Sequence, residues 1–102
     1  MRLEELENLF RQLLVDVARE LGFQFGKTRA AYILSNDKIS IGFTSFVERN
    51  GKFKIVMSSR SSKHPIWAGE YTPEELQGDR GKAKLEIMQQ IQILNNEGKT
   101  FW

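Results

Sequence analysis

The 102-residue chain contains no cysteine and a single histidine, His64. The lack of cysteine excludes disulfides, thiolate chemistry and every cysteine-ligated metal site. One histidine does not suffice for a multi-histidine zinc site within one chain. The sequence assigns neither a nucleophile nor a paired carboxylate to His64 as partners in general base catalysis. We therefore expect a protein that is not an enzyme and has no metal or cofactor.

Long apolar runs are also missing. No stretch approaches the roughly 20 residues that a membrane-spanning helix needs, and the first residues are charged and amphipathic, unlike a signal peptide. The apolar content of 40% and the charged content of 27% are ordinary for a globular protein. We expect residues 1–102 to form one soluble, cytoplasmic domain with a single core and no membrane partner.

Positive charge is concentrated in the middle of the chain. The formal net charge is only +2. Residues 27–64 carry eight basic and two acidic side chains, a charge of +6, whereas the segments on either side each carry −2. A surface of one sign attracts polyanions whatever fold lies beneath it. The segment from 27 to 64 is therefore where a binding site is expected.

The two ends of the chain have helical periodicity. Apolar residues at the spacing i, i+3, i+4, i+7 run from Leu3 to Leu21 and end before Gly22. A second stripe, which Leu85 and Ile93 widen, ends before Gly98; it consists of Ile87, Met88, Ile91 and Leu94. Ahead of it, Thr72-Pro73-Glu74-Glu75 is a capping box that predicts a helical turn over Pro73–Leu76.

Between the helices the apolar period is two. If Asn36-Asp37 is a two-residue turn, Leu34 pairs with Ile39, and the apolar residues share one face. In the next hairpin a two-residue Asn50-Gly51 turn would scatter the apolar residues over both faces. A three-residue loop over 49–51, with Gly51 in the left-handed conformation, restores one apolar face by pairing Val47 with Phe53, Ser45 with Ile55 and Phe43 with Met57.

A fourth strand is predicted over Pro65–Tyr71, at an edge because proline opens it. The predicted fold is α+β: a four-stranded antiparallel sheet with two amphipathic helices on one face, in the order α-β-β-β-β-α. This arrangement leaves the other face of the sheet open.

The two hairpin registers place charged residues on the open face. They put Lys27 beside Phe46 and Phe46 beside Lys54 in one row, with Arg29 in the next row and Lys52 at the hairpin end. An aromatic ring between lysines is typical of surfaces that bind single-stranded nucleic acid by stacking bases and holding phosphates. In the alternative, Phe46 packs under the C-terminal tail or a partner subunit and the lysines only solubilise the sheet.

Two further segments are candidates. The serine-rich loop between Ser58 and Pro65 contains Arg60 and Lys63, and it suits either a phosphate-binding loop or an ordinary flexible loop.

The last helix opens with Gly81-Lys82-Ala83-Lys84. Lysines in the first turn oppose the helix dipole, which is unfavourable unless an anion is recruited there. A helix, three antiparallel strands and a helix with this opening are together similar to the double-stranded RNA-binding domain, with a fourth strand added here.

The predicted function is that of a small non-enzymatic nucleic-acid-binding module, with single strands favoured. Its predicted binding residues are Lys27, Arg29, Phe46, Lys52, Lys54, Arg60 and Lys63. The alternative is a protein-interaction module, an inhibitor or adaptor, that docks a partner on the same face or on the sheet edge. Both hypotheses are compatible with a homodimer.

Overall fold

The computed structural model describes residues 3–29, 31–58, 65–76 and 81–97. The elements in chain order are α1 (Leu3–Leu21), β1 (Gln24–Lys27), β2 (Tyr32–Ser35), β3 (Ser40–Val47), β4 (Phe53–Ser58), β5 (Trp67–Tyr71), α2 (Pro73–Leu76) and α3 (Lys82–Glu97). The predicted α+β class with an antiparallel sheet is confirmed. The predicted strand number is wrong, because the sheet has five strands instead of four, and the short helix α2 precedes α3.

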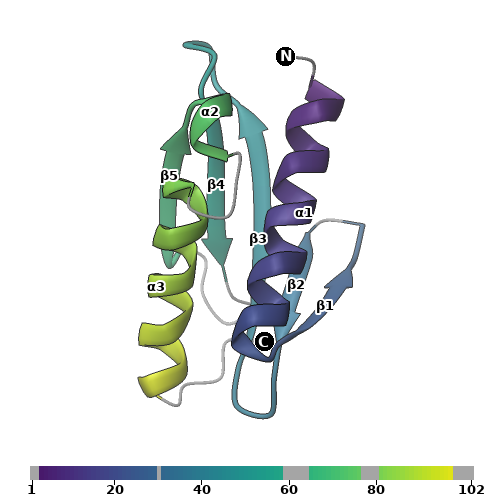
Figure 1. The fold of residues 1–102 in the computed structure, drawn as a ribbon, viewed down its shortest axis with the longest axis vertical. Coiled ribbons are helices and arrows are strands. Elements are labelled where there is room, and N and C mark those ends of the chain that lie inside the picture. The colour runs from purple at the N-terminus through teal and green to yellow at the C-terminus, as the bar shows by residue number, and fades with distance from the viewer. Residues whose placement is uncertain (1–2, 30, 59–64, 77–80, 98–102) are drawn as a thin grey trace.

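The sheet is a meander. Its strands lie in the order β1-β2-β3-β4-β5, and every neighbouring pair is antiparallel. All three helices lie on one face of it, with α1 toward β1 and β2 and α3 toward β5 (Figure 1). The core lies between the helices and this face, and its largest fully buried side chains include Phe10, Leu14, Leu34, Ile41, Phe43, Phe53, Ile55, Tyr71, Ile87 and Ile91. The opposite face of the sheet has no helix over it among the described residues.

The extra strand arises because the chain folds back after β1. Lys27 pairs with Tyr32, and the Thr28 N–H donates to the Ala31 carbonyl at 2.8 Å. The Thr28 hydroxyl accepts a hydrogen bond from the Ala31 N–H at 3.0 Å, so it closes the turn in place of the glycine or asparagine that usually signals one. The predicted placement of Lys27 beside Phe46 requires a single strand through this segment, so that placement is wrong.

The β2–β3 register differs by two residues from the predicted one. Leu34 pairs with Ile41 instead of Ile39. The connection is longer because the Asn36 side-chain oxygen accepts hydrogen bonds from the N–H groups of Lys38 and Ile39, both at 2.8 Å. A slip of two residues preserves the face of each side chain. The apolar residues therefore still face the helices.

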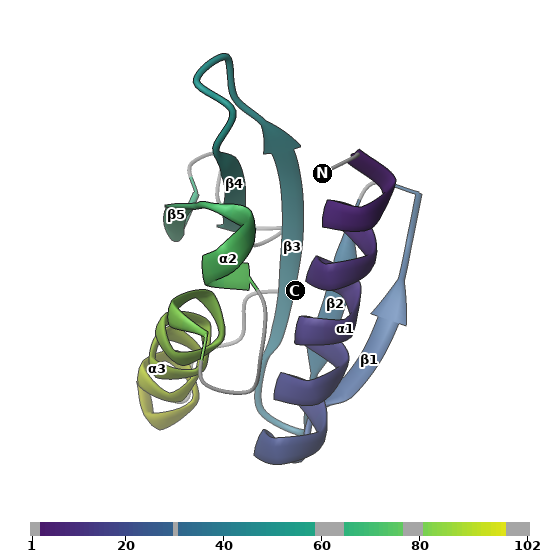
Figure 2. The ribbon, with the colours of Figure 1, turned by 45° about the horizontal axis from the view of Figure 1, so that its top comes forward.

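The β3–β4 register is confirmed. Val47 pairs with Phe53, Ser45 with Ile55 and Phe43 with Met57. The loop spans residues 49–51: the Glu48 N–H donates to the Lys52 carbonyl at 2.9 Å, and Gly51 has φ of 84°. This hairpin projects beyond the rest of the sheet (Figure 2).

Replacing Gly51 tests this loop. Gly51→Ala is expected to lower the free energy of unfolding by about 1 kcal/mol, because a side chain at positive φ is strained. Nothing lies within 4 Å of a Cβ built at Gly51, so a loss would come from the backbone conformation alone. Urea unfolding measures the change, and an unchanged midpoint would contradict the assigned loop.

The capping box at the start of α2 is confirmed. The Thr72 N–H donates to Glu75 Oε1 at 2.9 Å, and the Glu75 N–H reaches Thr72 Oγ1 at 3.4 Å. The hydrogen bond from the Thr72 backbone holds the pKa of Glu75 below its usual value. Both interactions are those of a reciprocal N-terminal cap.

Removing the hydroxyl of this cap has a modest expected effect. Thr72→Ala is expected to cost about 0.5–1 kcal/mol of folding stability, because the Glu75 N–H loses the side-chain acceptor and keeps only the Thr72 carbonyl, 3.1 Å away. Thr72→Ser, which keeps the hydroxyl, is the control in the same thermal unfolding experiment. Equal losses in the two variants would show that the threonine methyl group, and not the cap, is responsible.

Two apolar residues predicted to widen the buried face of the last helix lie outside the core. Leu85 and Ile93 of α3 are each about half exposed. Ile87, Ile91 and Leu94, on the neighbouring stripe, are buried as predicted.

Candidate functional site

The open face of the sheet places Phe46 beside Lys54, as predicted. The two are Cα partners across β3 and β4, and the Lys54 Nζ lies 5.8 Å from the centre of the Phe46 ring. Phe46 is 50% exposed, so its ring is available to a ligand. Lys52 is exposed at the base of the projecting hairpin loop.

Lys27 and Arg29 are not in this row, and that part of the prediction is wrong. Because β1 folds back, Lys27 pairs with Tyr32 and lies two strands away from β3. Its side chain is on the helix side of the sheet, where its Nζ lies 5.7 Å from the centre of the Tyr32 ring. Arg29 lies in the connection between β1 and β2.

Carboxylates offset the charge of Lys54 on the open face. Glu48 Oε1 lies 3.6 Å from Lys54 Nζ, and Glu70 of β5 is the next residue in the row. A hydrogen bond between the Glu48 and Glu70 carboxyl groups raises the pKa of Glu70 above its ordinary value, and their mutual repulsion adds to the shift. The open face is therefore not uniformly basic.

The serine-rich loop contains the remaining two predicted binding residues. Arg60 and Lys63 lie outside the described residues. Their loop follows Ser58, which is the end of β4 remote from Lys52 and Lys54. Six strand residues at about 3.3 Å each separate the two ends.

The lysines that open α3 pair with carboxylates of the protein itself. Lys84 is only 4% exposed, and its Nζ lies 3.0 Å from Glu20 Oε2 of α1. Lys82 Nζ lies 3.6 Å from Glu75 Oε2 and 4.0 Å from Glu86 Oε1. These lysines tie α3 to α1 and α2. The interpretation that they recruit an external anion against the helix dipole finds no support in these contacts.

A different feature stands out at the hairpin end of the sheet. The β2–β3 ladder ends at Tyr32 and Phe43, but β3 continues to Val47. Figure 1 shows β3 running on past the end of β2. Among the described residues, no strand lies beside residues 44–47 on the side away from β4. We call this stretch the free edge of β3.

The pairing pattern identifies the backbone groups at the free edge. The Glu48 N–H donates to the Lys52 carbonyl at the end of the β3–β4 ladder, and the Asn36 N–H donates to the Ile39 carbonyl at the end of the β2–β3 ladder. Hydrogen-bonded pairs recur every second residue in an antiparallel ladder. Thr44 and Phe46 therefore bond to β4, while the N–H and C=O groups of Ser45 and Val47 point to the free edge.

The side chains of this stretch are unusually apolar for a surface. Phe46 is 50% exposed on the open face, and Val47 is 42% exposed on the helix side. Within the described strands they are the only large apolar side chains with this exposure. They lie on the part of β3 that has no neighbouring strand.

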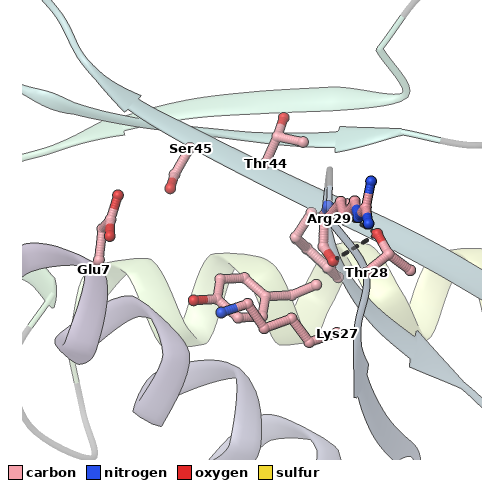
Figure 3. A pocket seen from close by; sticks show the side chains of 9 residues that line it. Glu7, Lys27, Thr28, Arg29, Thr44 and Ser45 are labelled. Carbon is pink, nitrogen blue, oxygen red and sulfur yellow. Dashed lines mark hydrogen bonds between the residues drawn. The ribbon is translucent and has the colours of Figure 1, made fainter.

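A cavity of about 240 Å³ adjoins the free edge on the helix side. Its lining includes Tyr32, Ser45, Lys27, Arg29 and Glu7. Figure 3 shows Glu7 of α1 on one side of this cavity and Arg29 on the other, with Ser45 on β3. We call it the edge cavity.

The cations of the edge cavity differ from three lysines elsewhere in the described structure, Lys54, Lys82 and Lys84. Lys54, Lys82 and Lys84 each have a carboxylate within 4.0 Å. Within the described part of the chain, neither Lys27 nor Arg29 has a carboxylate at ion-pair distance. The sequence pattern assigned both residues to the open face, whereas in the structure both line the edge cavity.

The described regions were also compared with the requirements of a metal site and of a membrane-spanning helix. These regions contain no group of three or more His, Asp or Glu side chains arranged to hold a metal ion. No helix among them is both long and apolar enough to cross a bilayer. Comparison with protein-family models, curated proteins and solved structures finds no match to this chain.

Proposed function

We propose that this protein is a protein-interaction module that accepts an extended segment of a partner as an added strand on the free edge of β3. The observation that carries the proposal is that β3 extends beyond the end of β2. This extension bears both exposed large apolar side chains of the described strands, Phe46 and Val47. Strand addition provides main-chain hydrogen bonds for affinity and side-chain contacts for specificity. Both requirements are met between Ser45 and Val47.

The contrast with the β5 edge of the sheet supports this proposal. Natural sheets protect their edges with proline, charged side chains and short strands. The β5 edge has Pro65 just before it and the exposed Glu70 within it. Residues 44–47 of β3 contain neither a proline nor a charged residue. An edge without such protection is typical of a surface that pairs with another chain.

The free edge predicts an alternating pattern of amide hydrogen exchange along β3. In the unbound protein, the amides of Ser45 and Val47 are expected to exchange at least about tenfold faster than those of Thr44 and Phe46, because only the latter donate to β4. Exchange followed by NMR gives each amide separately. Equal protection at all four would show that the edge is already paired.

Peptide binding tests the proposed function. The probe is a fluorescent peptide of about seven residues in which valine alternates with a polar residue, measured in serine, glutamate and lysine versions. Binding is expected to slow the exchange of Ser45 and Val47 while leaving Glu48 unchanged, because the Glu48 N–H already donates to Lys52. If no version of the peptide binds, the proposed function is wrong.

A proline substitution tests whether the peptide binds by pairing with the free edge of β3. Val47→Pro removes an N–H that faces the free edge and not β4, so the sheet is expected to remain folded. Peptide affinity is expected to fall about tenfold or more through the lost hydrogen bond and the proline ring. Val47→Thr keeps the N–H and is the control, and circular dichroism checks the fold of both. Unchanged affinity in Val47→Pro would exclude strand addition here.

Single-stranded nucleic acid is the second candidate ligand. The pairing of the exposed Phe46 ring with Lys54 favours it. Binding of an oligothymidine is expected to weaken by about 1–3 kcal/mol in Phe46→Ala, with little change in salt dependence. Lys54→Ala is expected to flatten the salt slope by about one phosphate contact. Parent-like oligonucleotide binding by both variants would reject this candidate. The binding roles of Lys27, Arg29, Lys52, Arg60 and Lys63 in it stay predictions.

A further inference from the structure

We infer that the segment docked on the free edge of β3 is acidic and places a carboxylate opposite Ser45, where Lys27 and Arg29 bind it. This inference rests on the proposed function and names the chemistry of the partner. It concerns one side of the docked segment only, the side that faces the helices.

The position follows from the geometry of an added strand. Residues directly opposite each other in neighbouring strands place their side chains on the same face of the sheet. Ser45 is on the helix side, since its partner in β4 is the buried Ile55. A residue docked opposite Ser45 therefore directs its side chain toward the edge cavity, which Ser45 lines together with Lys27 and Arg29.

The charge of the edge cavity favours an anion. Its lining has two basic side chains, Lys27 and Arg29, and one acidic side chain, Glu7 of α1. Neither cation has a carboxylate at ion-pair distance in the described residues. The Lys27 Nζ lies over the Tyr32 ring, 5.7 Å from its centre, so its position is supported by the ring. Such a cation loses less conformational freedom when it binds a carboxylate.

The other side of the docked segment meets different chemistry. A residue opposite Phe46 directs its side chain to the open face, beside the exposed ring and Lys54. An apolar side chain suits this position because it covers the ring. The expected partner segment therefore alternates acidic and apolar residues, which is the pattern of an extended strand with two distinct sides.

The alternating peptides test the inference without knowledge of the natural partner. In an alternating peptide every second residue is charged, so every second register along β3 places a charged side chain opposite Ser45. The peptide therefore binds without a defined starting position along β3. The glutamate version is expected to bind tighter than the serine version, and the lysine version weakest. Lys27→Gln and Arg29→Gln are each expected to weaken glutamate-peptide binding about two- to fivefold while leaving serine-peptide binding unchanged.

A charge reversal makes the test sharper. The double variant Lys27→Glu, Arg29→Glu is expected to bind the lysine peptide better than the glutamate peptide, because specificity between charged partners follows the sign of the site. Arg19→Gln is the matched control: it is exposed, lies in the last turn of α1 and lines no edge cavity. It is expected to bind all three peptides like the parent.

The outcomes separate the inference from the proposed function. If the three peptides bind equally and all lose affinity in Val47→Pro, strand addition stands and the acidic partner is wrong. If none binds and Val47→Pro has no effect, both are wrong. If the charge-reversed variant still prefers glutamate, the edge cavity does not select the partner. Oligothymidine binding that needs Lys27 and Arg29, without any peptide binding, would assign these cations to nucleic acid instead.

Discussion

Replacing Phe10 by alanine is expected to lower the free energy of unfolding by about 3–5 kcal/mol, the usual cost of truncating a buried phenylalanine. Phe10 of α1 is fully buried. Its ring packs edge-to-face against Tyr32 and Phe53, with ring centres 5.7 Å apart in both pairs. Truncation therefore leaves a cavity between α1 and two strands of the sheet, and it removes two favourable aromatic contacts.

Urea unfolding measures this loss. Arg11→Ala, one residue along the same helix and exposed, is the control and is expected to change stability by less than about 0.5 kcal/mol. Phe10→Leu, which keeps most of the apolar volume, is expected to retain more of the stability than Phe10→Ala. A loss below about 1.5 kcal/mol in Phe10→Ala would mean that this interface is less tightly packed than described.

Phe10 also connects the core to the candidate site. Tyr32 contacts Phe10 on the core side and lines the edge cavity, where Lys27 lies over its ring. A truncated Phe10 removes part of the support of this ring. Peptide binding measured on folded Phe10→Leu is therefore informative about how far the edge cavity depends on the core.

The second large effect is expected at Gly69. This glycine lies in β5 opposite Ile55, on the helix side of the sheet. A Cβ at this position would lie 2.6 Å from the Tyr71 hydroxyl oxygen and 2.8 Å from two carbons of the Trp67 ring. All three contacts are shorter than a Cβ tolerates, so one or both aromatic side chains must move. Gly69→Ala is expected to cost about 1–3 kcal/mol, the range for overpacking a core.

Movement of Tyr71 has its own cost. Its hydroxyl donates a hydrogen bond to Glu86 Oε2 at 2.7 Å, which links β5 to α3. Burial raises the pKa of Tyr71 well above its ordinary value, so the hydroxyl keeps its proton and remains a donor. A displaced ring breaks this bond and leaves the buried Tyr71 hydroxyl without its partner.

Gly26 provides a matched control for Gly69. It also lies in a strand, β1, but nothing lies within 4 Å of a Cβ built there. Gly26→Ala is expected to be neutral or to stabilise by up to about 1 kcal/mol, because alanine restricts the unfolded chain. Thermal unfolding of the two variants compares the same substitution with and without steric overlap. Equal effects would show that the aromatic rings over Gly69 move without cost.

Several elements follow from local sequence patterns. The apolar stripe of residues 3–21 predicts α1, and the Thr72–Glu75 capping box predicts α2. The three-residue loop ending at Gly51 follows from one requirement, that Val47 and Phe53 share a face. These predictions succeed because helical periodicity, caps and tight turns depend on residues that are close together in the chain.

Face assignment also survives an incorrect register. The sequence pattern pairs Leu34 with Ile39, whereas the structure pairs it with Ile41, and its side chain is in the core in both registers. The alternation of a strand has a period of two, so a slip of two residues moves each side chain along the sheet without turning it over. For β2, β3 and β4 the sequence alone therefore determined which residues face the helices, but not which residue lies opposite each of them.

What only the tertiary structure decided is the neighbour of each strand. The turn after Lys27 is closed by the Thr28 hydroxyl, and nothing in the residue types announces that the chain folds back there. That turn moves Lys27 and Arg29 from the open face to the edge cavity, and it leaves β2 too short to cover residues 44–47 of β3. A free edge is a difference between the lengths of two paired strands. An alternating sequence pattern indicates which face of the sheet a side chain occupies, but not where the neighbouring strand ends. The free edge of β3 could therefore be identified only from the tertiary structure.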